Sequence, residues 1–172
     1  TYDGATAINA GTLNITNATG LGSTVGATTI SSGATLRIAN VSVGNENLTI
    51  NGGEIYSVGS TSSLSGNILL GANSTFNAAT GNLTLSGNIS SGGSPYGFSK
   101  AGVGTLVLSG DNTFSGVVSF SAASGSTLRL GSATALGNAS KVSISALNVT
   151  LDVAGWETSR PIEFTNSGYL TS

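Results

Sequence analysis

Charged residues are scarce in this chain of 172 residues, making up 7% of it where roughly 25% is usual. The net charge is −2 and the five cations are scattered, so the chain has no basic face that would attract nucleic acid, and we expect no such partner. Long apolar runs are also missing, because Gly, Ser, Thr or Asn interrupts every few positions. A membrane-spanning helix, which needs roughly 18 apolar residues, is therefore excluded.

Cysteine and histidine are absent. The chain can form neither disulfides nor thiolate metal sites, and the commonest transition-metal ligand is missing, so we expect no metal and no cofactor. A secreted chain of this size without disulfides must gain its stability from a long continuous core. Methionine is absent, and Glu, Lys and Arg are rare, which leaves no segment with the composition of a helix and predicts an all-β fold.

Short segments that alternate apolar and polar residues predict strands with one buried face. These segments are 13–15, 36–38, 48–50, 83–85, 106–108, 128–130 and 149–153. Between them lie 51–53, 92–95 and 110–112, where Gly, Asn, Asp and Pro supply the backbone conformations of tight turns. In the last of these turns Asp111 is expected to act as a cap.

The spacing of the strands predicts a solenoid. Leu13 and Leu36 are 23 residues apart, Leu106 and Leu128 are 22 apart, and Leu128 and Leu151 are 23 apart, a period typical of stacked repeats. We predict a right-handed parallel β-helix of about eight rungs of roughly 22 residues, with Leu, Ile and Val forming one interior column. A β-sandwich or barrel built from antiparallel hairpins is the alternative, and the constant step argues against it.

A longer repeat lies above this period. Thr12-Leu13 with Leu21-Gly22 recurs 115 residues later as Thr127-Leu128 with Leu136-Gly137, which indicates a unit near 112–115 residues. We predict one continuous β-helix over 1–172. Within it, 1–40 is the second half of a repeat unit, 41–155 is one full unit and 156–172 begins the next. The chain is expected to be an excerpt of a tandem array flanked by further repeats.

The segment from Lys100 to Gly116, KAGVGTLVLSGDNTFSG, resembles the autotransporter-associated β-strand repeat, with the pattern K-x-G-x-G-T-L-x-L-S-G-x-N-x-[YF]-x-G. Its trailing elements match 126–131 and 135–137, where Ser126 replaces the usual Gly. The resemblance covers nearly the whole chain. It implies a β-helical passenger region of a large bacterial protein, exported to the cell surface, and it brings no catalytic residues.

Catalysis would need carboxyl groups brought together from neighbouring rungs, as in polysaccharide-active β-helix enzymes. No two acids are separated by the rung step, and the Ser and Thr residues lack a His, Cys or lysine base that would activate them. We therefore predict no catalytic residue and no enzyme. The acids are Asp3, Glu46, Glu54, Asp111, Asp152, Glu157 and Glu163.

Aromatic residues are few, and most are expected to fill the core or its corners. Trp156 has no counterpart in the repeat. It is therefore the aromatic residue that we predict to contact a ligand, such as a sugar ring.

The sequence predicts a structural or adhesive stalk segment of a large secreted surface protein, located outside the bacterial cell. The alternatives are a self-assembling extracellular fibre or matrix subunit and, third, a polysaccharide-active enzyme. The expected partners are the flanking repeats of the same protein, other copies of the chain in a fibre, or a host or matrix glycan or protein.

Overall fold

The computed structural model describes residues 1–121, 124–165 and 169–171, and these contain twenty strands and no helix. The strands form three sheets, A, B and C, and from β13 onward the described strands alternate between sheets B and C. Sheet A contains β1 (Thr6–Ile8), β3 (Thr28–Ile30), β6 (Leu48–Asn51), β9 (Ile68–Ala72) and β12 (Ile89–Ser90). Sheet B contains β2 (Thr12–Ile15), β4 (Thr35–Ala39), β7 (Glu54–Val58), β10 (Ser74–Ala78), β13 (Phe98–Ala101), β15 (Val117–Phe120), β17 (Lys141–Ile144) and β19 (Ile162–Phe164). Sheet C contains β5 (Ser42–Val43), β8 (Thr61–Leu64), β11 (Asn82–Leu85), β14 (Thr105–Leu108), β16 (Thr127–Leu130), β18 (Thr150–Asp152) and β20 (Tyr169–Thr171).

The described strands pair in parallel, as the predicted solenoid requires. Leu13 pairs in register with Leu36, Leu106 with Leu128, and Leu128 with Leu151. Each of the three leucine spacings in the sequence therefore corresponds to one turn of the coil. The step is less constant elsewhere, because Leu36 pairs with Ile55 after only 19 residues. No pair of hairpin strands occurs among the described residues, and the sandwich alternative is wrong.

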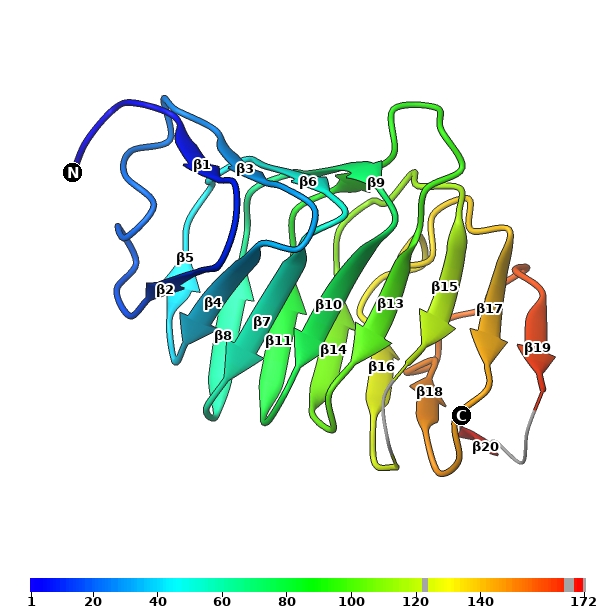
Figure 1. Cartoon of the computed structure of the whole chain (residues 1–172). Coiled ribbons are helices and arrows are strands. Elements are labelled where there is room, and N and C mark those ends of the chain that lie inside the picture. The colour runs from blue at the N-terminus through cyan, green and yellow to red at the C-terminus, as the bar shows by residue number, and fades with distance from the viewer. Residues whose placement is uncertain (122–123, 166–168, 172) are drawn as a thin grey trace.

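Figure 1 shows the sense of the coil. Sheet B runs downward at the front, sheet C returns upward behind it, and sheet A lies along the top, while successive turns advance from left to right. This is a right-handed coil, the sense that nearly all parallel crossover connections adopt. The coil has about seven turns, slightly fewer than the eight predicted. In the described part of the chain, no helix has the length and apolarity needed to span a membrane.

The interior is a continuous apolar column. On sheet B, one column runs Leu36, Ile55, Phe76, Lys100 and Phe120 through paired strands. All five side chains are buried. Each turn buries too little apolar surface to be stable alone, so the turns stabilise one another through this shared core. The single lysine in the column is the exception, and it is considered below.

Several strands escape detection in the sequence because small polar residues take inward positions. Ser57 in β7, Ser62 in β8 and Ser74 in β10 are all buried. A serine at an inward position interrupts the alternation of apolar and polar residues that identifies a strand. The hydroxyl of Ser74 donates to the Ala72 carbonyl oxygen at 2.9 Å, which satisfies its polar atom inside the core.

Segments that the sequence marks as equivalent lie on different sheets. Thr12-Leu13 belongs to β2 in sheet B, whereas its counterpart Thr127-Leu128 belongs to β16 in sheet C. The same offset relates β4 in sheet B to β18 in sheet C. Equivalent segments are therefore separated by a whole number of turns and a further step from one sheet to the next. As a result, the second copy is rotated about the solenoid axis relative to the first.

Candidate functional site

The outer surface of sheet B carries a group of polar and aromatic side chains on β4 and β7. Thr35 pairs in register with Glu54, and Arg37 pairs with Tyr56. All four are half-buried outward-facing residues. Elsewhere this surface carries serine, for example Ser99 and Ser119 in register on β13 and β15. Arg37, Glu54 and Tyr56 therefore interrupt a surface of mostly small residues, on which the Lys141–Glu163 ion pair of β17 and β19 is a second charged place.

The charged groups at this place bind uncharged neighbours. One carboxylate oxygen of Glu54 accepts a hydrogen bond from the Asn77 amide at 2.8 Å, and the other accepts from the Thr35 hydroxyl at 3.4 Å. The Arg37 guanidinium donates to the Asn14 side-chain oxygen. Among the described residues, Arg37 makes no ion pair and the Tyr56 hydroxyl has no hydrogen-bond partner.

Two shallow grooves meet here. One has a volume of about 280 Å³ and is lined by Thr12, Thr35, Arg37, Glu54 and Tyr56. The other, of about 260 Å³, is lined by Thr35, Glu54, Thr75 and the turn residues Gly33, Ala34, Gly52 and Gly53. Because they share Thr35 and Glu54, they form one depression, which we call the Tyr56 trough. Sequence analysis missed it, because its residues come from strands about 20 positions apart and only the register brings them together.

Trp156 lies in the loop that follows β18, where it is 43% exposed. Its backbone N–H donates to the Val153 carbonyl oxygen at 2.8 Å, which closes a turn. The residues that follow, Glu157 to Arg160, line a hollow of about 120 Å³ in which Trp156 is not a lining residue. The Trp156 indole is exposed enough to meet a ligand, but no observation tests this contact, and it stays a prediction.

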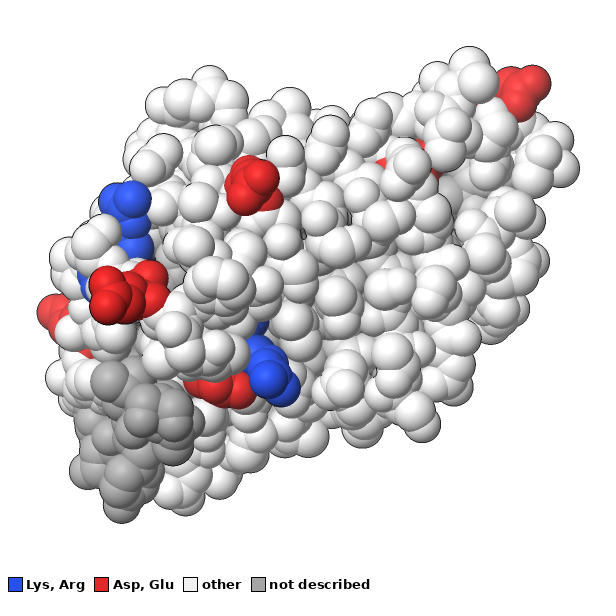
Figure 2. Space-filling view, turned by 180° about the vertical axis from the view of Figure 1, so that it is seen from behind, with Lys and Arg blue, Asp and Glu red and all other residues white. Residues whose placement is uncertain are grey.

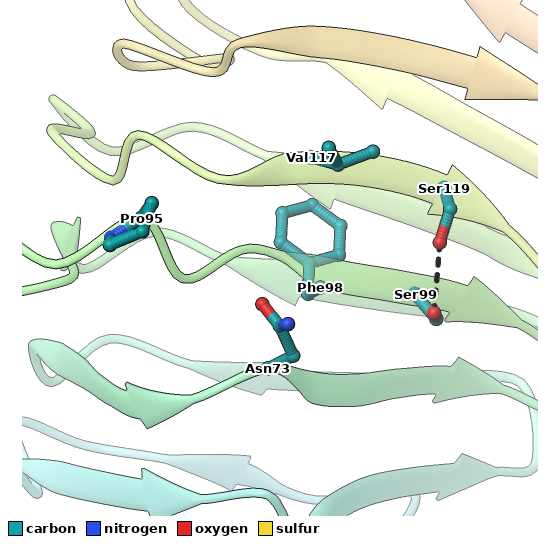
Figure 3. Close-up of a pocket in the computed structure, with 6 residues that line it drawn as sticks. All are labelled: Asn73, Pro95, Phe98, Ser99, Val117 and Ser119. Carbon is teal, nitrogen blue, oxygen red and sulfur yellow. Dashed lines mark hydrogen bonds between the residues drawn. The ribbon is translucent and has the colours of Figure 1, made fainter.

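A further hollow of about 190 Å³ lies at the corner where the loop before β13 meets sheet B. Figure 3 shows the Phe98 ring at this hollow, between Val117 and Asn73. Its polar groups are already paired: the Ser99 and Ser119 hydroxyls lie 2.9 Å apart, and the Asn73 side-chain oxygen accepts the Gly97 N–H at 2.9 Å. This hollow therefore offers a ligand fewer free donors than the Tyr56 trough.

The carboxyl groups form no cluster in the described residues. Asp111 accepts a hydrogen bond from the Thr134 hydroxyl of the next turn at 2.7 Å, so its side chain bridges turns, and the expected cap within its own turn is not found. Asp152 and Glu163 form ion pairs with Arg129 and Lys141. No group of three or more acids that could hold a metal ion is present among the described residues.

Lys100 is the buried cation of the interior column. Its ammonium donates to the carbonyl oxygens of Ala101 at 2.8 Å and Gly102 at 2.9 Å, and to the Ser126 hydroxyl at 2.8 Å. These three acceptors match its three donors. Ser126, which stands where the resembling family has Gly, lies just before β16 on the next turn. Lys100 therefore ties the turn between β13 and β14 to the following rung.

Burial lowers the pKa of Lys100 from 10.5 to about 8. Between pH 8 and pH 10.5, Lys100 is protonated in the unfolded chain but neutral in the folded chain. Raising the pH through this range therefore increases the free energy of unfolding, and lowering the pH to 8 removes this increase. We expect Lys100→Met to lose this pH dependence. At pH 7 it should also destabilise the fold by about 1–3 kcal/mol, because three acceptors lose their donor.

Urea unfolding at pH 7.5 and at pH 9.5 checks this expectation. From pH 7.5 to pH 9.5, the free energy of unfolding should rise more in the natural chain than in the Lys100→Met variant. Ser126→Gly is the milder companion variant, since it removes one of the three acceptors and keeps the amine. Equal pH dependence in the natural chain and in Lys100→Met would contradict the assignment.

Comparison with known proteins finds similar sequences. The passenger-associated-transport-repeat family matches residues 1–15 and 98–135. A curated relative, the adhesin BmaC autotransporter of Brucella suis biovar 1 (strain 1330), is 39% identical over 93 residues, which cover 54% of this chain and 2% of the relative. No solved structure matches significantly. Both matches support the predicted resemblance to an autotransporter passenger repeat.

Proposed function

We propose that this chain is a rigid adhesive segment of an autotransporter-type passenger, displayed outside the bacterial cell, and that it contacts partners without catalysing a reaction. The observation that carries the proposal is the stack of parallel turns around one apolar core, in a chain that matches the passenger-associated-transport-repeat family over part of its length. The relative's printed name, an adhesin, supports an adhesive role for this segment.

The proposed role depends on two properties of the coil, its stiffness and an outer surface with few charged side chains. The described strands are hydrogen-bonded to those of neighbouring turns, and most of their inward apolar residues lie in the common core, so the coil resists bending as a unit. Figure 2 shows the face of sheet C, much of which carries no Lys, Arg, Asp or Glu. Such a surface favours contacts through hydrogen bonds and shape over strong charge attraction.

An assay with the intact chain coupled to beads tests the proposal. Beads carrying the folded chain should bind host cells or extracellular matrix, and beads carrying chain that has been irreversibly unfolded should not, since the contact surface exists only in the coil. Binding equal to that of uncoated beads would contradict the adhesive role.

The same assay separates the alternatives. The broad uncharged face favours a second candidate, lateral association of copies into a fibre. Beads that aggregate with one another and leave cells untouched would select this second candidate. Release of soluble sugars from a polysaccharide by the folded chain would select the enzyme.

A further inference from the structure

The Tyr56 trough is a polar depression in which Arg37 and Tyr56 have hydrogen-bonding groups that the described residues leave unused. We propose that it binds an acidic oligosaccharide, with a sugar ring on Tyr56, the sugar carboxylate on Arg37 and sugar hydroxyls on Glu54. The inference deepens the adhesive function proposed above and rests on it, because it names the chemistry of one partner.

Arg37 supplies the charge complementarity. Its guanidinium has five N–H donors in a planar fork that matches a carboxylate. It donates to Asn14 and forms no ion pair among the described residues. Glu54 lies on the neighbouring strand but pairs with Thr35 and Asn77 instead. The remaining donors of Arg37 are therefore available to an acidic group from outside the chain.

Tyr56 supplies the apolar surface. It is paired in register with Arg37, so the two side chains stand on adjacent strands about 4.8 Å apart. An aromatic ring with a polar tip suits a ligand that has an apolar face and hydroxyl edges, as a sugar does. The Tyr56 hydroxyl has no partner among the described residues and can donate to that ligand.

Glu54 is already oriented to accept hydrogen bonds. The Asn77 amide and the Thr35 hydroxyl hold its two oxygens in place. Each carboxylate oxygen has a further lone pair for a hydroxyl donor. Glu54 lies where the two grooves meet, and together their volumes fall in the range of about 300–1,000 Å³ that ligand sites usually have.

A sugar fits the trough better than an acidic peptide does. Extended peptides usually bind by adding a strand to a free sheet edge. β2, which contributes only Thr12, is the last strand of sheet B. The strands that carry Arg37, Glu54 and Tyr56 have no free edge, because β4 pairs with β2 and β7, and β7 pairs with β4 and β10. A peptide would gain no backbone hydrogen bonds here, whereas a sugar needs only side chains.

Binding of hyaluronan hexasaccharide, whose sugars alternate between a uronate and a neutral amino sugar, tests the proposal by calorimetry on the intact chain. Chitohexaose is the neutral control probe. We expect hyaluronan to bind about tenfold or more tightly than chitohexaose, the effect of one charge-assisted contact. Tyr56→Ala and Arg37→Gln should each weaken hyaluronan binding about tenfold or more.

Arg129→Gln is the matched control, because Arg129 is an exposed arginine on sheet C that pairs with Asp152. It should leave binding unchanged, and circular dichroism should show all variants folded. No binding of hyaluronan, equal binding by all variants, or preference for an acidic peptide would each overturn the proposal. Bead adhesion that survives in Tyr56→Ala would overturn this site and leave the adhesive function standing, whereas hyaluronan binding without bead adhesion would count against that function alone.

Discussion

Replacing Phe98 with alanine is expected to lower the free energy of unfolding by about 3–5 kcal/mol, the cost of deleting a large aromatic side chain from a packed core. The Phe98 ring is 2% exposed and lies between two other buried rings. Its centroid is 4.7 Å from that of Phe76 and 5.4 Å from that of Phe114, in a tilted and an edge-on arrangement. Both geometries are favourable for aromatic pairs, and alanine would lose both.

Urea unfolding followed by circular dichroism measures this loss. Phe164→Ala is the matched control, since that ring is 42% exposed in β19, and we expect it to cost about 1 kcal/mol or less. The rings of Phe76, Phe98 and Phe114 link successive turns, so the variant should also unfold less cooperatively. Equal losses for Phe98→Ala and Phe164→Ala would contradict the packing described here.

The second large effect is expected at the corner between sheets C and A, where three glycines stack on successive turns. A Cβ added at Gly87 would lie 2.0 Å from the carbonyl oxygen of Gly66, and one added at Gly110 would lie 2.2 Å from that of Gly87. The obstructing atoms are backbone, so the whole rung would have to move. We expect Gly87→Ala to destabilise the fold by about 3 kcal/mol, near the upper end for overpacking.

Gly44→Ala provides the comparison, because a Cβ at Gly44 would meet nothing within 4 Å. It should change the free energy of unfolding by about 1 kcal/mol or less. Thermal unfolding of the two variants and the natural chain distinguishes the cases. A Gly87→Ala variant as stable as Gly44→Ala would show that the rungs are spaced more widely at this corner.

Sequence analysis predicted the fold because apolar residues recur at the step of the coil. Leu13, Leu36, Leu106, Leu128 and Leu151 are all members of the sheet ladders, at the predicted spacing. Some of the strands that were missed have serine at inward positions, as β7, β8 and β10 do, or only two residues, as in β5 and β12. Periodicity cannot identify such strands, because an inward serine interrupts the alternation of apolar and polar residues and two residues are too few to show it.

The Tyr56 trough was beyond reach for a different reason. Its lining depends on the register between β4 and β7, whose step is 19 residues, while the regular leucines indicate 22–23. An error of three residues in the step would place Arg37 against a turn and not beside Tyr56. Trp156 could be singled out because it has no counterpart in the repeat. The missing counterpart shows that this position differs between copies, but it does not identify a ligand.

The offset of equivalent segments by one sheet has a consequence for how an extended protein meets its surroundings. Each further unit with the same offset would move its copy of a given residue from one sheet to the next around the rod. Three consecutive units would point the same side chains in three directions, and the fourth would face the way the first does. A cell or fibre alongside the rod could then contact an equivalent surface at any rotation of the rod about its long axis.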